Sequence, residues 1–323
     1  MSIETLQQAK NSLQSLTESL WIFTALNVLS ESKILTVLNE EKTLEELEKT
    51  SKLPKSVLEQ TINLLIETGF IIAEKNYVIL APGMQALIEK INPERFAAQL
   101  RTAFGLTSEF IKSSREQNLK TGWHYQDELI LQAQGAHSEY IVTDCIPQDA
   151  NFQNILKKDN SLFLDVGAGV GKISLRLCQD YDNIRVIALE PADAPFFLAK
   201  KNITESPYND RITLRKTYIQ DLTDSNLFDA AWFPHVFFPD ELLHVSLINI
   251  WEALKPGGML LTTAILPEKL NQSLYVRQLI NTLYGGLRTA NDMTNALKEI
   301  GFQDIKVFSE VGGYRTITAC KQR

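Results

Sequence analysis

Ser161-Leu-Phe-Leu-Asp-Val-Gly-Ala-Gly-Val-Gly171 is the stretch that decides the fold of this 323-residue chain. Its apolar start predicts a buried strand that ends at Asp165, and glycines follow at positions 167, 169 and 171. The next residues, Lys172-Ile-Ser-Leu-Arg-Leu-Cys-Gln, have the apolar spacing of a helix. A strand, a glycine loop and a helix in this order let a ligand approach the backbone, where the helix N-terminus offers unpaired N–H groups and a partial positive charge.

Two kinds of ligand suit such a loop. A dinucleotide site usually reads Gly-x-Gly-x-x-Gly, whereas this chain reads Gly-x-Gly-x-Gly. Asp165 stands two residues before the first glycine, where its carboxylate would repel a pyrophosphate but suits a cation. The pattern Asp165-Val-Gly-Ala-Gly-Val-Gly171 resembles motif I of the class I S-adenosylmethionine-dependent methyltransferases, whose cofactor carries an ammonium and a sulfonium. The alternative is a structural turn that binds nothing.

Three further segments favour the methyltransferase interpretation. Arg185-Val-Ile-Ala-Leu-Glu190-Pro191 predicts a second strand ending in an acid, which can accept hydrogen bonds from ribose hydroxyls. Tyr218-Ile-Gln-Asp221-Leu222 matches the family's position for the adenine amino group, although a solvated loop aspartate is an alternative. A fourth strand at 227–233 precedes a helix end, a Pro-Gly-Gly turn and a fifth strand, an order typical of the family.

The resemblance covers roughly residues 159–323 and implies a Rossmann-like α/β domain. Two strands, at 305–308 and 314–319, are expected to form the antiparallel pair that completes a seven-stranded sheet. The implied cofactor is S-adenosylmethionine, with S-adenosylhomocysteine as product. The cofactor-binding residues that it implies are Asp165, Gly167, Gly169, Gly171, Glu190, Pro191, Gln220, Asp221, Leu222 and Phe233.

Composition and charge narrow the class of protein. The formal net charge of −7 argues against nucleic acid or an anionic membrane surface as partner. No apolar run approaches the roughly 18 residues of a membrane span, and the first residues lack the pattern of a signal peptide. Three widely spaced cysteines predict reduced thiols in the cytoplasm, and the four histidines show no metal-ligand spacing, so no metal is expected.

The N-terminal part predicts a mostly helical domain. Residues 13–38 are too apolar for a lone surface helix. A capping box at Thr43-Leu-Glu-Glu46, a helix up to Thr68 and two short strands in 70–80 give a winged-helix pattern. DNA binding is the alternative that this pattern raises, but residues 1–100 hold 9 Lys and Arg against 13 Asp and Glu.

Small-molecule O-methyltransferases of the plant and bacterial natural-product type resemble this chain over nearly its whole length. In them such a module dimerises the enzyme and contributes to the acceptor pocket, so a homodimer with residues 13–38 in its interface is expected. The predicted division is a winged-helix-like dimerisation domain at 1–105, a helical linker and lid at 106–158, and the catalytic domain at 159–323.

Candidate acceptor residues lie in three segments. The linker carries aromatic and amide side chains that suit the lid of an organic pocket, although simple packing between domains would also explain them. The segment after the fifth strand has three polar residues on one helix face, which an exposed face would explain equally well. The predicted acceptor-binding residues are Trp123, Tyr125, Gln134, Ser138, Phe237, Phe238, Arg277, Asn281 and Tyr284.

The general base is where this chain departs from the family. A hydroxyl acceptor gains from a base, and O-methyltransferases carry one in a His-Asp-Trp-x-Asp-Glu motif after the fourth strand. This chain reads Pro234-His-Val-Phe-Phe-Pro-Asp-Glu241, so that an ungapped alignment places Val236 at the base position and His235 one residue earlier. His235 is the candidate base if the loop is rebuilt; otherwise the acceptor is a phenolate, an amine, an indole nitrogen or an activated carbon.

The sequence therefore predicts S-adenosylmethionine-dependent methyl transfer to a small aromatic or heterocyclic natural product, with O-methylation first. N- or C-methylation is an alternative because the histidine is displaced. A non-methylating enzyme that keeps the cofactor for hydroxylation or rearrangement is another. A transcription regulator would need a basic recognition surface that the N-terminal part lacks.

Overall fold

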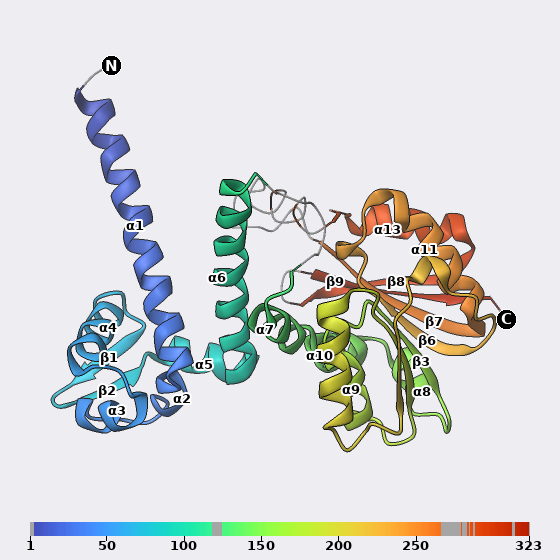
Figure 1. Ribbon diagram of the computed structural model, residues 1–323, viewed down its shortest axis with the longest axis horizontal. Coiled ribbons are helices and arrows are strands. Elements are labelled where there is room, and N and C mark those ends of the chain that lie inside the picture. Colours follow the sequence, from blue (N-terminus) through green and yellow to red (C-terminus); the bar gives the residue numbers. More distant parts are fainter. Residues whose placement is uncertain are drawn as a thin grey trace. The chain divides into compact units, whose positions relative to one another are not determined.

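The computed structural model describes residues 3–117, 125–265, 279, 283, 285–286, 288–311 and 314–322. Two compact units, Met1–Thr107 and Ser108–Arg323, make up the chain (Figure 1). Each unit is described by itself below. The three-part division made from the sequence stays a prediction.

The first unit is mostly helical. It contains α1 (Ile3–Glu31), α2 (Ile34–Val37), α3 (Leu44–Ser51), α4 (Lys55–Glu67), β1 (Ile71–Glu74), β2 (Tyr77–Leu80), α5 (Pro82–Ile91) and the first part of α6 (Pro93–Arg115). Thr43 and Glu46 form the expected capping box at the start of α3. β1 and β2 pair as an antiparallel hairpin.

The apolar residues of α1 fall into two groups. Ala25, Leu26 and Leu29 are buried with α2, α4 and the hairpin in the core of the unit. Nearer the N-terminus, large apolar side chains are exposed instead: Leu6, Leu13, Leu16, Leu20 and Trp21. This half of α1 therefore has an apolar face without a partner within its own unit.

The second unit is an α/β domain. Among the described residues, the α-helices that lie wholly in this unit are α7 (Glu128–Ser138), α8 (Ala150–Leu156), α9 (Lys172–Asp180), α10 (Asp193–Thr204), α11 (Asp240–Ala253) and α13 (Ala290–Ile300). Its strands are β3 (Leu162–Val166), β4 (Arg185–Leu189), β5 (Ile212–Arg215), β6 (Phe228–Phe233), β7 (Leu254–Ile265), β8 (Phe302–Val311) and β9 (Tyr314–Lys321). The seven strands form one sheet in the order β5-β4-β3-β6-β7-β9-β8.

The predicted topology of the sheet is confirmed. The strands from β5 to β7 run parallel, and β9 pairs antiparallel with both β7 and β8. The Pro-Gly-Gly turn lies within β7 rather than before it, because Leu254 already pairs with Phe228 and the register shifts before Met259 pairs with Ala230. The sequence placed the start of this strand too late.

Side chains alternate between the two faces of the sheet. Phe163 of β3 packs in a cluster with Phe152 of α8 and Leu177 of α9, whereas its neighbour Leu164 packs in a cluster with Leu247 of α11. Helices therefore cover both faces, as the nearly continuous apolar runs of the parallel strands require. Because both faces are covered, a ligand site can form at the loops that follow the carboxyl ends of the strands.

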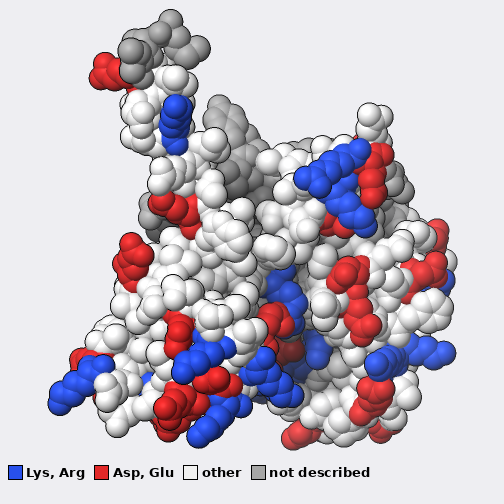
Figure 2. Space-filling view, turned by 60° about the vertical axis from the view of Figure 1, so that its left-hand side comes forward, with Lys and Arg blue, Asp and Glu red and all other residues white. Residues whose placement is uncertain are grey.

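No helix within the described ranges is both long enough and apolar enough to cross a membrane. On the face in Figure 2, acidic and basic side chains are interspersed among the described residues.

Candidate functional site

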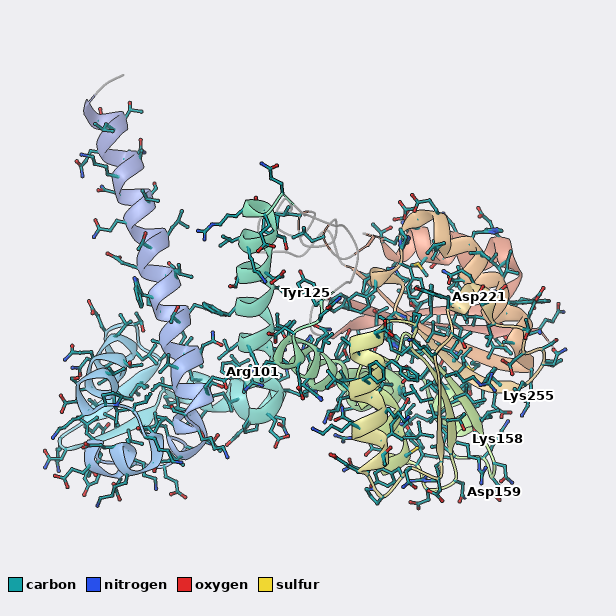
Figure 3. The ribbon with its side chains drawn as sticks, viewed as in Figure 1. Arg101, Tyr125, Lys158, Asp159, Asp221 and Lys255 are labelled. Atoms are coloured by element: carbon teal, nitrogen blue, oxygen red, sulfur yellow. The ribbon has the colours of Figure 1, made fainter. Side chains whose placement is uncertain are left out.

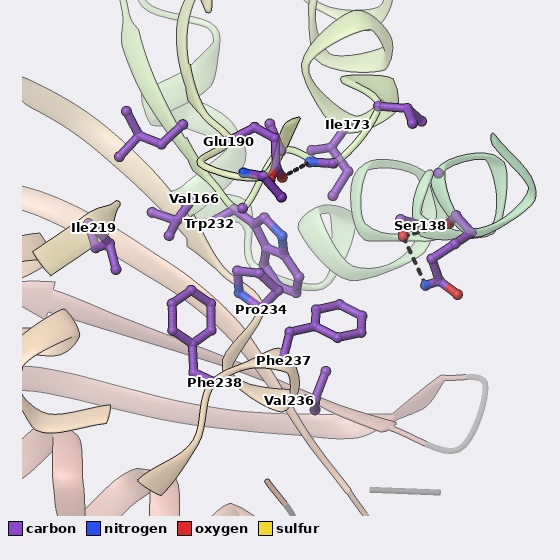
Figure 4. Close-up of a pocket in the computed structure, with 18 of the residues that line it drawn as sticks. Ser138, Val166, Ile173, Glu190, Ile219, Trp232, Pro234, Val236, Phe237 and Phe238 are labelled. Carbon is purple, nitrogen blue, oxygen red and sulfur yellow. Dashed lines mark hydrogen bonds between the residues drawn. The ribbon is translucent and has the colours of Figure 1, made fainter. Parts of the chain in front are cut away.

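A cavity of about 360 Å³ lies at the carboxyl ends of β3, β4 and β6 (Figure 4). The loop after β3, the loop after β4 and the loop after β6 all contribute to its lining, together with α7 and the start of β9. In open α/β sheets ligands bind in the crevice outside the carboxyl ends of the strands. The cavity is therefore where this fold would place a ligand.

The glycine loop forms the cavity wall next to β3. Gly167, Gly169 and Gly171 have positive φ angles of 63°, 58° and 80°, a conformation that side chains disfavour. A Cβ at Gly169 would meet no atom within 4 Å, so a ligand can approach the backbone closely at this glycine. Gly171 is the N-cap of α9, and it places the helix N-terminus directly behind the loop.

Glu190 lies next to the loop, at the end of β4. Its side chain is 6% exposed, and its two carboxylate oxygens accept hydrogen bonds from the backbone N–H of Gly169 at 2.8 Å and of Ala192 at 2.9 Å. Burial raises the pKa of the Glu190 carboxyl to about 7. Each oxygen keeps lone pairs beyond these bonds, so the carboxylate can accept two hydroxyl donors.

Asp165 lies at the end of β3, and it is fully buried. Ser174 Oγ donates a hydrogen bond to its Oδ2 at 2.5 Å, while Oδ1 has no hydrogen-bond partner among the described residues. Burial raises the pKa of this carboxyl to about 7. Asp165 is not among the residues that line the cavity, and its hydrogen bond joins the end of β3 to α9.

The short helix Ile219–Asp221 forms a further part of the wall. Ile219 and Gln220 line the cavity, and Asn249 of α11 donates to both of their carbonyl oxygens at 2.9 Å. Asp221 ends this helix with an exposed side chain (Figure 3), and it is not a lining residue. Leu222 is also absent from the lining, since it packs in the domain core.

Helix α7 contributes two of the predicted residues. Gln134 and Ser138 line the cavity, and the Gln134 amide donates to the Ser138 hydroxyl at 3.4 Å (Figure 4). Between them, Gly135 allows close contact with the glycine loop, because a Cβ there would lie 2.3 Å from Cγ2 of Val170. Tyr125 is buried outside the lining, and Trp123 lies outside the described residues.

The loop after β6 supplies an apolar wall. Val236, Phe237 and Phe238 all line the cavity, beside Trp232 and Pro234 (Figure 4). The predicted cofactor residue Phe233 is instead fully buried, with its ring centroid 4.8 Å from that of Phe238. The predicted residues Arg277, Asn281 and Tyr284 lie outside the described residues.

His235, the candidate base, is fully buried and does not line the cavity. Its Nε2 donates to the carbonyl oxygen of Thr263, and its Nδ1 lies 3.4 Å from Nη1 of Arg288. Burial, with a contribution from the nearby Arg288, lowers the pKa of His235 to about 3. The imidazole is therefore neutral, and both nitrogens are already engaged within the protein.

Sequence reasoning missed several lining residues, among them His137, Tyr140, Lys172 and Tyr314. The ring of Tyr140 lies 5.4 Å from that of His137 and 6.2 Å from that of Tyr314, measured between centroids. The spacing of His137 three residues after Gln134 on a helix was a usable signal. Tyr314 gave none, because only the sheet pairing brings it to the cavity.

Comparisons with known proteins agree with this geometry. A family model described as a methyltransferase domain matches residues 163–258. The tRNA1(Val) (adenine(37)-N6)-methyltransferase of Dyadobacter fermentans is 33% identical over 86 residues, which are 27% of this chain and 36% of that protein. The S-adenosyl-L-methionine-dependent methyl transferase PigF of a Serratia species is 22% identical over 180 residues, 52% of this chain and 51% of that protein.

The chain thus spans between a third and about half of the length of these curated relatives. Among solved structures, human N-acetylserotonin methyltransferase in complex with S-adenosylmethionine aligns with a TM-score of 0.69 at 14% identity. The alignment covers 98% of both chains, so the two-unit architecture as well as the sheet is shared.

Proposed function

We propose that this chain, whose residues 163–258 match a methyltransferase domain, transfers a methyl group from S-adenosylmethionine to a small organic acceptor. S-adenosylhomocysteine is then the second product. The observation that carries this proposal is the Glu190 carboxylate, which accepts hydrogen bonds from the backbone N–H of Gly169 in the glycine loop and of Ala192 after β4, and keeps lone pairs for a ribose.

The residues of the cavity fit the cofactor part by part. Glu190 would accept hydrogen bonds from the ribose hydroxyls, and the open backbone at Gly169 would accommodate the methionine portion. Ile219 and Gln220 would lie against the adenine, while Asp221, which is not a lining residue, would need to turn inward to reach its amino group. When bound, the cofactor supplies an electrophilic methyl group on a sulfonium.

The acceptor that we propose is aromatic or heterocyclic. Val236, Phe237 and Phe238 offer it an apolar surface, and Gln134 and Ser138 offer hydrogen bonds from α7. The residues that touch it have to align its nucleophile with the methyl group, since alignment supplies much of the rate of such a displacement. O-methylation remains the first choice, because the structures that share this architecture include the mitomycin 7-O-methyltransferase MmcR.

One observation favours N- or C-methylation as the second candidate. The loop after β6 presents Val236 to the cavity, while His235 is neutral and faces the interior. The residues with which this loop lines the cavity therefore include no side chain that could take a proton from a hydroxyl. An acceptor whose nucleophile needs no deprotonation would react without such a base.

The test begins with calorimetric titration of S-adenosylmethionine and S-adenosylhomocysteine into the full chain. We expect micromolar binding that falls by about tenfold or more in Glu190→Ala, since hydrogen bonds to a charged group contribute about 1.5–3 kcal/mol. Glu205→Gln, a change of an exposed acid at the end of α10, is the matched control and should bind as the wild type does.

The second step separates methyl transfer from cofactor-assisted chemistry. The protein is incubated with methyl-labelled S-adenosylmethionine and a panel of phenols, aromatic amines and indoles. Labelled acceptor supports methyl transfer and identifies the atom that is methylated. Tight cofactor binding without label in any acceptor would favour hydroxylation or rearrangement instead, and failure to bind either ligand would refute the proposal.

We also propose that the protein is a cytoplasmic homodimer. The exposed apolar side chains of α1, including Leu13, Leu16 and Trp21, form a face that a second copy would cover. The three cysteines of the protein are free thiols and form no disulfide, as expected in a reducing compartment.

A further inference from the structure

We infer that Arg288 and His235 form a clamp that positions the apolar cavity wall of Val236, Phe237 and Phe238 and thereby determines which acceptor fits. The two are positioning residues in this proposal, since neither lines the cavity. The acceptor-selecting role depends on the proposed function, but the clamp itself can be tested without any turnover.

Arg288 fixes the backbone of the wall at several points. Its Nη1 donates to the carbonyl oxygen of His235 at 2.8 Å, and its Nη2 donates to the carbonyl oxygen of Phe238 at 2.9 Å and to Oδ1 of Asp240 at 2.6 Å. One planar guanidinium thus spans the loop from its first turn to the start of α11. A lysine ammonium is a point charge and cannot reproduce this fork.

The burial of Arg288 indicates that these bonds matter. Its side chain is 5% exposed, whereas that of its ion-pair partner Asp240 is 86% exposed. The exposed carboxylate compensates only part of the cost of removing the guanidinium from water. The carbonyl oxygens of His235 and Phe238 have to provide the rest, so the loop and the cation hold each other in place.

His235 occupies the other side of the clamp. A carbonyl oxygen can only accept, so the hydrogen of the imidazole is on Nε2, directed at Thr263 of β7. The unprotonated Nδ1 then faces Nη1 of Arg288. A proton on Nδ1 would place a second cation against the guanidinium, which is why this histidine serves as a neutral spacer between β7 and Arg288 rather than as a base.

Two glycines that precede Arg288 in the chain contact the backbone of the loop at 234–240. The backbone N–H of Gly286 donates to the carbonyl oxygen of Val236 at 3.2 Å. Gly285 has a φ angle of 147°, and a Cβ there would lie 2.8 Å from the carbonyl carbon of Phe237. Backbone contacts of this closeness leave the wall little freedom to adjust while the clamp is intact.

The clamp and the cofactor pocket are held by different bonds. Among the described residues, no hydrogen bond joins Glu190 or the glycine loop to the loop at 234–240, although a Cβ at Gly167 would lie 3.4 Å from Cγ of Pro234. Loss of the clamp should therefore alter the acceptor wall and leave the affinity for S-adenosylhomocysteine nearly unchanged. A general loss of structure would reduce both.

The experiment is hydrogen exchange, measured by mass spectrometry on the full chain with and without S-adenosylhomocysteine. In Arg288→Gln we expect the peptide that covers residues 234–240 to exchange about tenfold faster or more, which corresponds to about 1.4 kcal/mol of lost local stability. Arg185→Gln, which removes an exposed arginine at the start of β4, is the matched control and should exchange as the wild type does.

Two further variants make the result specific to the guanidinium. Arg288→Ala should recover protection of 234–240 when guanidinium ion is added but not when methylammonium is added. His235→Asn, which keeps a donor but shortens it, should accelerate exchange in the same peptide by a smaller factor. If Arg288→Gln does not fold, these two variants still test whether the clamp holds the loop at 234–240.

Wild-type exchange at 234–240 in Arg288→Gln would overturn the clamp, and so would recovery with methylammonium. Failure of the wild type to bind S-adenosylhomocysteine would instead refute the proposed function, and the comparison in the absence of ligand would still test the clamp. For an acceptor that the wild type methylates, we expect Arg288→Lys to raise KM more than it lowers kcat.

Discussion

Glu190 is the residue on which the cofactor assignment depends, and its ionisation has consequences for stability. Its pKa is raised from 4.5 to about 7 by burial, so the folded protein holds a proton between these values that the unfolded chain has lost. The contribution of Glu190 to the free energy of unfolding is therefore fully present below about pH 4.5 and is lost as the pH rises to about 7.

We expect the ligand-free wild type to lose stability over this interval by more than Glu190→Gln does, by an amount on the order of 3 kcal/mol. Chemical denaturation of both proteins at a series of pH values measures it. Asp165 has the same direction of shift and remains in the variant, so only the difference between the two curves belongs to Glu190. Parallel curves would show that Glu190 is already ionised in the folded protein.

His235 has the opposite effect on how stability changes with pH. Its pKa is lowered from 6.5 to about 3, so the unfolded chain binds a proton between these values that the folded protein does not. Its contribution is fully present above about pH 6.5 and is lost as the pH falls toward 3. We expect His235→Asn to show a smaller loss of stability on acidification than the wild type, in denaturation curves between these limits.

Rates should show the same neutrality of His235. For an acceptor that the protein methylates, the dependence of kcat on pH should have the same shape in the wild type and in His235→Asn. An inflection lost in this variant would make His235 a base after all. His137, which lines the cavity, is the described histidine whose replacement by Asn should change the pH dependence if a histidine takes part.

The sequence could not decide on which side of the loop His235 lies. Counting back from Asp240 put Val236 at the family's base position, and the structure does bring Val236 to the cavity. The direction of each side chain depends on one short turn, His235–Phe237, and on its contact with Arg288 about 50 residues later. Such a contact leaves no periodic signal in a single sequence.

At the scale of elements, α7 and the glycine loop depend on one glycine. Gly135→Ala would place a methyl group 2.3 Å from Cγ2 of Val170, which is closer than van der Waals contact, so the helix or the loop has to move. We expect a loss of about 1–3 kcal/mol of stability, as in other overpacked sites, and weaker binding of S-adenosylmethionine. Thermal unfolding and calorimetry measure the two effects.

Gly83→Ala in α5 is the matched control. A Cβ at this position meets no atom within 4 Å, so the change should leave stability unchanged or slightly raise it through the better helix propensity of alanine. Equal effects of the two substitutions would mean that the contact between Gly135 and Val170 is easily relieved.

Elements with strong local signals were predicted well. The capping box at Thr43 and the strands β3, β4 and β6 follow from a few adjacent residues, and all are present. The position of the Pro-Gly-Gly segment was wrong, because pairing between Leu254 and Phe228 extends β7 past a sequence that normally ends a strand. Tertiary pairing overrode local propensity there.

At the scale of the whole molecule, the exposed face of α1 leads to a prediction about assembly. Leu16→Glu combined with Trp21→Glu should convert the proposed dimer to a monomer, because each charge would have to be buried in the interface. Light scattering after gel filtration measures the mass. Asn11→Glu, an exposed position on the opposite side of the same helix, is the control and should leave the mass unchanged. A wild type that is already monomeric would refute the homodimer.

The order of the strands in the sheet also affects how the domain is made. β9 follows β8 in the chain but lies between β7 and β8 in the sheet, so β8 has no partner strand until residues 314–321 have been synthesised. During that interval the N–H and C=O groups along the edge of β7 are unpaired, and they can pair with a strand of another nascent chain. Since Tyr314 begins β9 and lines the cavity, a growing chain completes its binding site only in the same step that closes this edge.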